Sequence, residues 1–275
     1  MLDLYYGNAD ACISYSHRRT SNPPEVDFHL HNRFEIYFFI SGGVNYLIEK
    51  KVYPLKYGDL LLINSHEIHR PAFISAVPYE RITIHFEPAV AQVFNSPRFD
   101  LLRCFTGRPD GEANRISLSP DQVGEVMKLF ARMEGAVQEG DRGGEVLKLS
   151  LFLELLVFIN NAGTCPDNAL NVPEKLSPVL DYIEINLAGD LSLEALERRL
   201  FINRYYLSRL FKQYTGSTIH EYIIYKRISL AKKLLDEGHN VSEACQRSGF
   251  GDYSNFIRIF KKTVGISPGR YKSPW

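Results

Sequence analysis

The last hundred or so residues of this 275-residue chain contain an internal repeat. A shift of 49 residues superimposes Glu194, Ala195, Arg198, Phe201, Arg209, Phe211, Lys212 and Gly216 on Glu243, Ala244, Arg247, Phe250, Arg258, Phe260, Lys261 and Gly265. Each copy has the pattern of a short helix, a tight turn and a longer helix that opens at a polar residue, Asn203 or Asp252. Repetition of one supersecondary unit restricts this region to two similar helical modules.

The longer helix of each copy combines an apolar stripe with a polar face. In the first copy Leu207, Leu210 and Phe211 recur at helical spacing and are expected to pack inward. The polar faces, with their first residues, carry Asn203, Arg204, Tyr205, Ser208, Arg209 and Lys212 in one copy and Tyr253, Ser254, Asn255, Ile257, Arg258 and Lys261 in the other. Arginine bonds guanine bidentately, Asn and Ser bond base edges, and an apolar group can meet the thymine methyl. Lysines toward the helix ends suit phosphates. We therefore predict that these residues bind DNA.

The distribution of charge agrees with this prediction. Residues 173–275 hold 16 Lys and Arg against 11 Asp and Glu, whereas residues 1–172 hold 16 against 21. A basic C-terminal third favours an anionic partner. An ordinary solvated helix surface would also tolerate such charges, but it does not explain why both copies keep Arg and Lys at matching positions.

Three segments of this region resemble one protein family. They are LSRLFKQYTG, EYIIYKRISLAKKLL and SGFGDYSNFIRIFKKTVGISPGRYK. The last segment is the most specific, with Gly249-Phe250, Gly265, Ser267-Pro268 and Tyr271 in their expected places. Residues from about 174 to 273 thereby resemble the DNA-binding domain of the AraC/XylS family of bacterial transcription regulators.

The resemblance implies two helix-turn-helix subdomains joined by one long helix over about 218–237. Both recognition helices would enter successive major grooves on one face of the duplex, about 34 Å apart. The chain departs from the family at Glu197 and Cys245, where a small Ala is usual, and at Ile257, where many members are polar. The implied function is regulation of transcription at a double-stranded DNA operator, with activation as the family's usual mode and RNA polymerase as a partner if the chain is an activator.

Residues from about 12 to 86 have the pattern of short strands. Aromatic-rich apolar runs at 34–41 and 44–49 are joined by Gly42-Gly43, which is a hairpin signal. Further strands are expected at 52–55, 59–63 and 79–86, between proline and glycine residues. Many short strands with frequent turns indicate a sandwich or a small barrel.

The strand region contains the spacing His29-x-His31-x3-Glu35-x6-Gly42, followed by Gly58-Asp59 and His69. Because side chains two residues apart lie on one face of a strand, the first two imidazoles would share a face. This pattern resembles the two motifs of the cupin fold, a double-stranded β-helix, and implies that Glu35 and His69 come from neighbouring strands. Three imidazoles and a carboxylate suit Mn, Fe, Ni, Cu or Zn.

Two uses of these residues stay open on the sequence alone. They could hold a divalent transition metal, with His29, His31, Glu35 and His69 as ligands, or they could bond a small molecule without a metal, as in many AraC-family sensor domains. Barrel mouths are common ligand sites, and three further side chains could contact a sugar. We predict a ligand pocket formed by His29, His31, Glu35, Tyr37, Tyr46, His69 and Arg81, whereas His66 and His85 belong to no motif and are expected in surface or core roles.

Residues 120–160 change to a helical period. Val123, Val126, Met127, Phe130 and Met133 fall on one face of a first helix, and Leu147, Leu151, Leu155 and Phe158 fall on one face of a second. The second helix is apolar on nearly every side, so it requires burial. Core packing and a homodimer interface are both consistent with that composition, and we expect a homodimer.

Residues 162–173, AGTCPDNALNVP, have the composition of a linker. The chain length also suits two domains. We therefore expect a cupin-like ligand-sensing and dimerisation domain over 1–161 and an AraC-type DNA-binding domain over 174–275. The fold class is α+β with two domains: a double-stranded β-helix with two helices, then an all-α domain with two helix-turn-helix subdomains.

Three functions are compatible with this organisation. The favoured one is a regulator in which a small metabolite, by family analogy a sugar or sugar derivative, shifts how the first domain holds the DNA-binding domain. The alternative is a metal-dependent cupin enzyme with a DNA-binding domain, although the sequence holds no Ser/His/Asp array, P-loop or nucleotide fingerprint. We therefore expect no enzymatic activity. A third is a constitutive DNA-binding protein with a purely dimerising barrel.

Four cysteines, Cys12, Cys104, Cys165 and Cys245, are scattered without CxxC spacing. This pattern favours free thiols in a reducing cytoplasm over a disulfide framework or a zinc site. The first residues lack the pattern of a signal peptide, and no apolar run reaches the roughly 18–20 residues of a membrane span. We expect a cytoplasmic protein.

Overall fold

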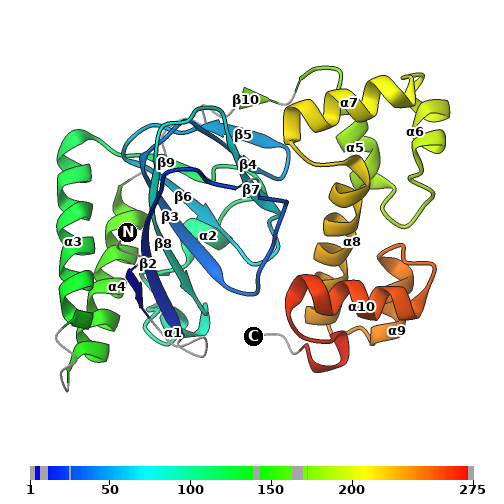
Figure 1. Ribbon diagram of the computed structural model, residues 1–275. Coiled ribbons are helices and arrows are strands. Elements are labelled where there is room, and N and C mark those ends of the chain that lie inside the picture. The colour runs from blue at the N-terminus through cyan, green and yellow to red at the C-terminus, as the bar shows by residue number, and fades with distance from the viewer. Residues whose placement is uncertain are drawn as a thin grey trace.

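The computed structural model describes residues 12–24, 26–138, 143–162 and 173–271, and the backbone of residues 4–6 and 170–171 (Figure 1). A sheet-rich part is followed by a wholly helical part, as expected. Most of the expected linker, and Cys165 with it, lies outside the described residues, as does most of the start of the chain. The other three cysteines are free.

Two antiparallel sheets make up the first part. The larger sheet has the order β1-β2-β8-β3-β6-β9 and the smaller has the order β10-β5-β4-β7. The strands are β1 (Leu4–Tyr6), β2 (Ile13–Thr20), β3 (Phe34–Ser41), β4 (Val44–Ile48), β5 (Lys51–Pro54), β6 (Asp59–Ile63), β7 (His69–Phe73), β8 (Tyr79–Phe86), β9 (Arg115–Ser117) and β10 (Leu170–Asn171). The predicted strands at 34–41, 59–63 and 79–86 are confirmed to the residue.

Alternation along β3 and β8 divides their side chains between two environments. Ile36, Phe38, Ile82 and Ile84 belong to a core between the larger sheet and two helices. Their neighbours Tyr37, Phe39 and Tyr79 belong to a second core between the two sheets. Because β3 pairs with β8 so that Glu35 lies opposite His85, polar residues of both strands share the inner face.

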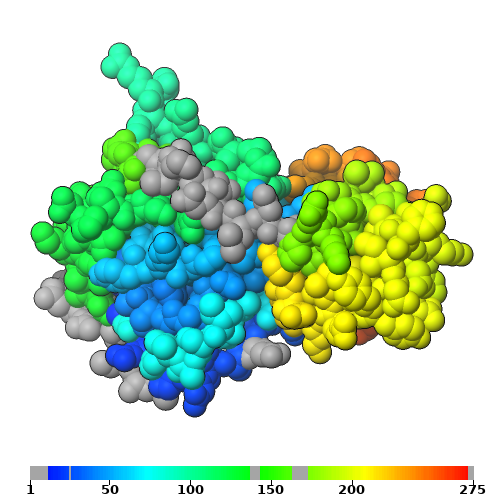
Figure 2. All heavy atoms as spheres, turned by 90° about the horizontal axis from the view of Figure 1, so that it is seen from above, coloured from blue at the N-terminus to red at the C-terminus, as the bar shows by residue number. Residues whose placement is uncertain are grey.

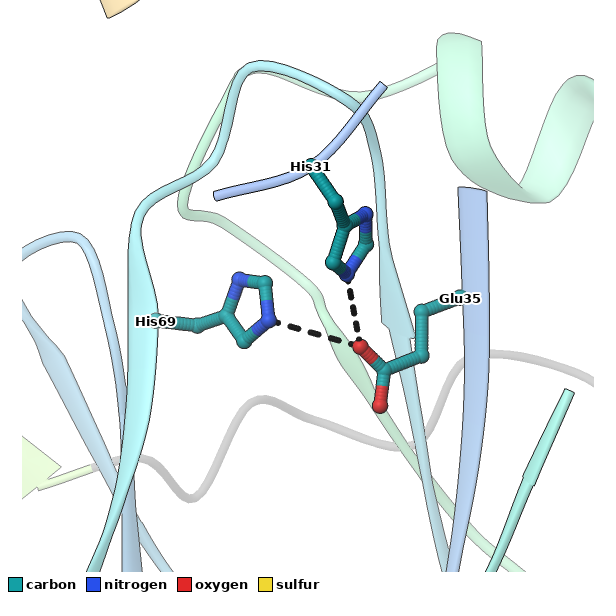
Figure 3. Close-up of side chains that lie close together, drawn as sticks. All are labelled: His31, Glu35 and His69. Atoms are coloured by element: carbon teal, nitrogen blue, oxygen red, sulfur yellow. Dashed lines mark hydrogen bonds and ion pairs between the residues drawn. The ribbon is translucent and has the colours of Figure 1, made fainter. Parts of the chain in front are cut away.

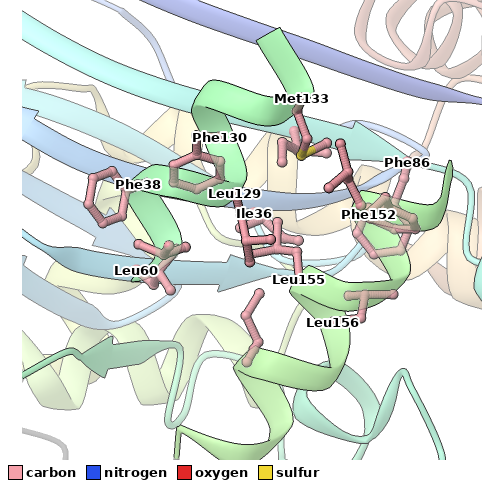
Figure 4. Packing of buried hydrophobic residues seen from close by; sticks show 14 of the residues in the cluster. Ile36, Phe38, Leu60, Phe86, Leu129, Phe130, Met133, Phe152, Leu155 and Leu156 are labelled. Atoms are coloured by element: carbon pink, nitrogen blue, oxygen red, sulfur yellow. The ribbon is translucent and has the colours of Figure 1, made fainter. Parts of the chain in front are cut away.

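Helices α3 (Pro120–Gln138) and α4 (Gly144–Asn161) cover the outer face of the larger sheet (Figures 1 and 4). The buried face of α3 includes Val126, Phe130 and Met133, as predicted. Figure 4 shows Phe130 beside Phe38 and Phe152 beside Phe86. Two short helices, α1 (Ala89–Gln92) and α2 (Arg103–Thr106), follow β8.

Helix α4 is only partly used by this core. Leu151 and Leu155 are buried as predicted, but Leu147 is exposed together with Val146 and Val157. The expected apolar stripe is therefore wrong at Leu147, because in this first turn it is Lys148 that lies on the buried face of α4. An apolar strip on α4 remains at the surface.

The helical part consists of α5 (Ser177–Ile185), α6 (Leu193–Leu200), α7 (Arg204–Thr215), α8 (Ile219–Asp236), α9 (Val241–Arg247), α10 (Tyr253–Val264) and the 3-10 turn η1 (Pro268–Arg270). The long helix α8 joins the two repeated units, and Figure 1 shows α7 and α10 toward its opposite ends.

Capping residues in the sequence determine where α7 and α10 begin and end. Asn203 and Asp252 accept backbone N–H bonds as N-caps, and Gly216 and Gly265 end α7 and α10 with positive φ.

The two units differ at their turns. Phe201 and Phe250 are equivalent in sequence, yet Phe201 is 93% exposed and Phe250 is buried. Helix α6 runs to Leu200 and Phe201 takes the left-handed conformation itself, whereas α9 ends earlier and Gly249 takes it. The longer turn in the second unit lets Phe250 pack against Phe256.

The two parts pack closely on one another. Phe28, Leu30, Leu47, Val52 and Ile68 of the sheet part share one buried cluster with side chains of α5 to α10. Figure 2 shows the two lobes meeting along a seam, with helical residues seated against strand residues. Within the described part of the chain, none of the helices has the length and hydropathy of a membrane span.

Candidate functional site

A cavity of about 1310 Å³ opens beside the inner face of the larger sheet. Of the seven predicted pocket residues it is lined by His29, His31, Glu35, Tyr37, Tyr46 and Arg81. His69 lies behind the wall and is fully buried. The remaining lining includes hydroxyl groups of β2 and β8, at Ser14, Ser16 and Thr83, which the sequence did not single out.

Glu35 lies at the centre of a group of imidazoles. Its Oε2 is 2.9 Å from Nε2 of His31, 3.3 Å from Nε2 of His69 and 3.3 Å from Nε2 of His85. Figure 3 shows His31 and His69 directed at this oxygen from two different segments. His29 packs its ring on that of His69, with centroids 4.2 Å apart, and is not among the donor atoms that converge.

Burial and charge oppose one another in this group. Burial alone would raise the pKa of Glu35, but the nearby His85 and hydrogen bonds from the imidazoles hold that pKa well below its ordinary value. Burial lowers the pKa of His29 to about 3 and that of His31 to about 4. For His85, the attraction of Glu35 outweighs burial and raises the pKa. Glu35 is therefore ionised, and the neighbouring imidazoles stabilise its carboxylate.

His85 was assigned to a surface or core role, and the structure corrects that assignment. The residue faces the cavity because β8 alternates, so that Arg81, Thr83 and His85 share one face. Its position opposite Glu35 follows from the pairing of β3 with β8. The alternation of residues 79–86 could have placed His85 on the same strand face as Arg81. It does not reveal which strand lies alongside. His66, the other histidine so assigned, is partly buried near Asp236.

The aromatic side of the cavity is hydrogen-bonded and cationic. The hydroxyls of Tyr37 and Tyr79 lie 2.8 Å apart, and Tyr46 packs on Tyr37 with ring centroids 4.7 Å apart. The guanidinium of Arg81 lies over the Tyr79 ring at 4.5 Å. Its Nη1 is buried and has no hydrogen-bond partner among the described residues. This atom is available to an acceptor on a bound molecule.

The predicted polar faces of α7 and α10 lie at the surface. Tyr205, Arg209 and Lys212 of α7 are exposed, and Ser208 is half-buried. Five residues of α10 follow the same pattern, with Tyr253, Ser254, Asn255, Arg258 and Lys261 exposed and Ile257 half-buried. Arg258 donates to Oδ1 of Asn255 at 2.7 Å. Both faces offer the residue types that read base edges.

Two predicted DNA-binding residues also have structural roles. Asn203 caps α7 by accepting from the N–H groups of Tyr205 and Tyr206. Arg204 forms ion pairs with Glu194 and Glu197 of α6. Glu197, which replaces the small residue usual at this position, thus fastens the two helices of the first unit through a charged side chain.

Helix α8 connects the cavity wall to the helical units. Nζ of Lys232 donates to the backbone carbonyl oxygen of His31 at 3.1 Å and to that of Ser65. The hydroxyl of Ser229 donates to the carbonyl of His66 at 2.7 Å. Lys232 is fully buried, and burial lowers its pKa to about 7.

Ion pairs flank these buried contacts. Lys226 of α8 pairs with Glu49 at the β4–β5 turn, and Lys50 pairs with Asp181 of α5 at 2.7 Å. Lys233 pairs with Asp110 on the other side. Since the pairs join two segments of the sheet part, the β4–β5 turn and the loop at Asp110, to α5 and α8, the cavity domain and the helical domain form a continuous contact in this arrangement.

A cavity-bearing sheet domain packed on two helix-turn-helix units defines a DNA-binding transcription regulator with a small-molecule-binding domain. Comparison with protein families agrees with this class. Residues 15–156, more than half of the chain, match the AraC-like ligand binding domain, and residues 196–273 match a helix-turn-helix domain. The chain belongs to the AraC family of transcription regulators.

Curated relatives carry related names. The HTH-type transcriptional activator RhaR of Mannheimia succiniciproducens is 21% identical over 257 residues, which cover 93% of this chain and 90% of the relative. The HTH-type transcriptional activator RhaS of Salmonella schwarzengrund is 30% identical over 145 residues, 52% of each protein. The chain thus spans about half the length of the RhaS proteins it matches.

Solved structures show weaker overall similarity. Fatty acid-bound ToxT from Vibrio cholerae is 13% identical, with 97% of this chain and 96% of that chain covered at a TM-score of 0.39. The DNA-binding domain of AdpA in complex with a target DNA is 27% identical, with 36% of this chain and 90% of that chain covered at a TM-score of 0.34.

Proposed function

We propose that this protein is a transcription activator whose operator binding responds to a small metabolite, a sugar or sugar derivative, bound in the cavity. The observation that carries the proposal is the contact of Lys232 with the carbonyl of His31. The helix that joins the two DNA-binding units touches the wall of the cavity directly. The names of the RhaR and RhaS relatives support activation over repression.

The lining of the cavity supports a ligand with several hydroxyl or carboxylate oxygens. Ser14, Ser16 and Thr83 offer hydroxyls, and Arg81 offers a buried N–H without a partner. The phenol of Tyr46 gives an apolar ring with a polar end, which suits the face and rim of a sugar. Polar groups placed in this way fix the orientation of a ligand within a pocket.

Coupling between cavity and DNA requires a ligand that prefers one arrangement of the two domains. A molecule that bonds the His31 side chain would also act on the segment before β3, whose carbonyl accepts from Lys232. Ser229 and Lys226 make further contacts from the same helix. Ligand binding would therefore change how firmly α8, and with it α7 and α10, is held against the sheet domain.

On this proposal α7 and α10 are the recognition helices. The base-reading candidates are Arg204, Tyr205, Ser208, Arg209, Tyr253, Ser254, Asn255, Ile257 and Arg258, with Asn203 at the start of α7 and with Lys212 and Lys261 on phosphates. The surface exposure of most of these residues supports the assignment, with Arg204, Ser208 and Ile257 half-buried. RNA polymerase is the further partner of an activator.

The exposed apolar strip of α4, at Val146, Leu147 and Val157, supports a homodimer formed through this helix.

The two-sheet arrangement is compatible with a cupin-like double-stranded β-helix over 1–161, a linker over 162–173 and a DNA-binding domain over 174–275. Cytoplasmic location stays a prediction from the cysteines.

A metal-dependent cupin enzyme is the second candidate. One observation favours it, since donor atoms of His31, Glu35 and His69 all lie within 4.8 Å of one another. The relatives' names describe regulators, which favours the first candidate. Turnover of an oxygenase or isomerase substrate by the metal-loaded protein would promote the enzyme.

The proposed function is tested by a thermal-shift screen of sugars, sugar acids and sugar phosphates against the full chain. We expect at least one to raise the unfolding temperature of wild type and not of Arg81→Ala. Arg132→Ala, on the outer helix α3, is a matched control that should respond as wild type does. A screen in which no compound stabilises the wild-type protein would favour the constitutive, purely dimerising barrel.

A further inference from the structure

Strands β2 and β8 place two arginines side by side on the inner face of the larger sheet. In their antiparallel pairing Arg18 lies directly opposite Arg81, and both residues line the cavity. Directly opposed residues of neighbouring strands point to the same side of the sheet, and like charges at such positions are destabilising. Arginine does not lose its proton in proteins. The two positive charges therefore repel one another unless an anion lies between them.

Neither arginine forms an ion pair with a carboxylate in the described part of the chain. The next residue, Arg19, does have such a partner, since its Nε lies 3.8 Å from Glu80. Nε of Arg18 instead donates to the hydroxyl of Ser16 at 3.1 Å. Nη1 of Arg81 is buried without a hydrogen-bond partner among the described residues, which is unfavourable for a charged donor. This end of the cavity thus has two cationic groups and an unused donor.

The polarity of the inner face changes along the strands. Two residues beyond the arginine on β8, Thr83 lies opposite Ser16, and two residues further His85 lies opposite Ser14. On its other side His85 lies opposite Glu35 of β3. The cavity wall therefore has a cationic row, a hydroxyl-bearing row and a row with a carboxylate. At about 3.3 Å per residue, the first and last rows are about 13 Å apart.

We propose that the cavity binds a polyhydroxylated anion, with its acid group between Arg18 and Arg81 and its hydroxyl groups toward Thr83 and Glu35. Guanidinium groups match carboxylate and phosphate oxygens in geometry, and hydrogen bonds between ionised groups are the strong ones. The ionised Glu35 accepts from a hydroxyl and repels an acid group, which fixes the direction of the ligand. A neutral sugar would leave both positive charges uncompensated. As a narrowing of the effector to sugar acids and sugar phosphates, this assignment rests on the proposed function.

The test compares glucose, galactose and mannose, each with its uronate and its 6-phosphate, by thermal shift and calorimetry of the full chain at constant ionic strength. Inorganic phosphate and glycolate are added as acid groups without a sugar. We expect a uronate or a phosphate to bind at least about tenfold more tightly than its neutral parent, which is the range of one hydrogen bond to a charged group. Comparison of the uronates with the phosphates identifies which acid group the site takes.

Variants of the two arginines test where the acid group lies. Arg18→Gln and Arg81→Gln should each weaken binding of the charged compound by about tenfold or more, because each removes one charged donor. Arg19→Gln is the matched control and should bind within about twofold of wild type, since its exposed charge already has a partner. Without ligand, Arg18→Gln should unfold at a temperature no lower than wild type, because the substitution removes a like-charge pair. A purely structural role would lower that temperature.

Three results would overturn the proposal: no binding of any charged compound by wild type, equal binding of a neutral hexose and its charged forms, or equal affinity of wild type and Arg18→Gln. Arg18 is exposed and decides the matter if Arg81→Gln does not fold, as checked by circular dichroism. Operator affinity measured with the same compounds separates the two proposals. A neutral effector would leave the regulatory function without the anion site, whereas a charged compound that binds through Arg18 and leaves operator affinity unchanged would contradict the regulatory function alone.

Discussion

Nζ of Lys232, on the helix that joins the two DNA-binding units, lies 3.1 Å from the backbone carbonyl oxygen of His31. The side chain of that same His31 contacts Glu35 in the cavity. His31 therefore lines the cavity with its ring and contacts the DNA-binding domain through its backbone carbonyl.

Lys232→Met should uncouple the two sites. The substitution leaves the carbonyls of His31 and Ser65 without this donor, at a cost of about 1–3 kcal/mol for each buried group, partly offset by removal of a buried cation. We expect the cavity ligand still to bind while operator affinity no longer changes with ligand. Lys128→Met, an exposed lysine on helix α3, is the control. An unaltered ligand response in Lys232→Met would exclude this route.

Arg209→Ala and Arg258→Ala should each weaken binding to the specific operator by about 1–3 kcal/mol, because each guanidinium can bond one guanine bidentately. Affinity for scrambled DNA should fall less. Fluorescence anisotropy with both duplexes at one fixed salt concentration measures the two losses. Unchanged operator affinity in both variants would remove these residues from base reading. Arg132→Ala, on helix α3, controls for loss of charge.

Lys261→Ala should act on every DNA sequence alike. A lysine toward the end of α10 is placed for phosphate, so its removal releases about one fewer counterion on binding. The plot of log affinity against log salt should become shallower by about one unit. Measurement at several salt concentrations with specific and scrambled duplexes checks this. A loss confined to the specific operator would assign Lys261 to base reading instead.

The ion pair between Asp110 and Lys233 should stabilise the domain contact in a pH-dependent manner. Burial opposes ionisation of Asp110, but hydrogen bonds from Lys233 and Asn64 outweigh it and lower the pKa below 3.8. A lowered folded pKa contributes stability above the ordinary pKa and loses it as pH falls through the folded value. The free energy of unfolding of wild type should therefore exceed that of Asp110→Asn at pH 5–6, by less than about 1 kcal/mol, with the excess shrinking below about pH 4. Urea unfolding of both proteins across this pH range measures the difference in their free energies of unfolding. A difference that stays constant with pH would refute the role of the pair.

Local pattern was sufficient for much of the fold. The strands at 34–41 and 59–63 and the joining helix have strong periodicity and clear end signals, and their predicted bounds agree with the structure. Strand β2 was not predicted because its second half, His17 to Thr20, is polar and gives no alternation of apolar residues. Strand β7 was not predicted because Pro71 interrupts its short run.

The site depends on contacts that a linear pattern does not contain. His31 and Glu35 were identified because they lie close together in the sequence. His85 joins them only through the pairing of β3 with β8. Lys232 belongs to a helix with ordinary surface charges in its sequence, and its burial arises from the packing of one domain on the other. Such long-range relationships determine which titratable groups meet.

The most direct test of the central claim compares operator affinity with and without the cavity ligand. The operator is first selected from genomic fragments with the full chain, and the ligand is the compound that stabilises wild type in the thermal-shift screen. Anisotropy at fixed salt should then show a change of at least about fivefold on ligand saturation, absent in Arg81→Ala. Equal operator affinity with and without saturating ligand in the wild-type protein would contradict the claim that the cavity controls DNA binding.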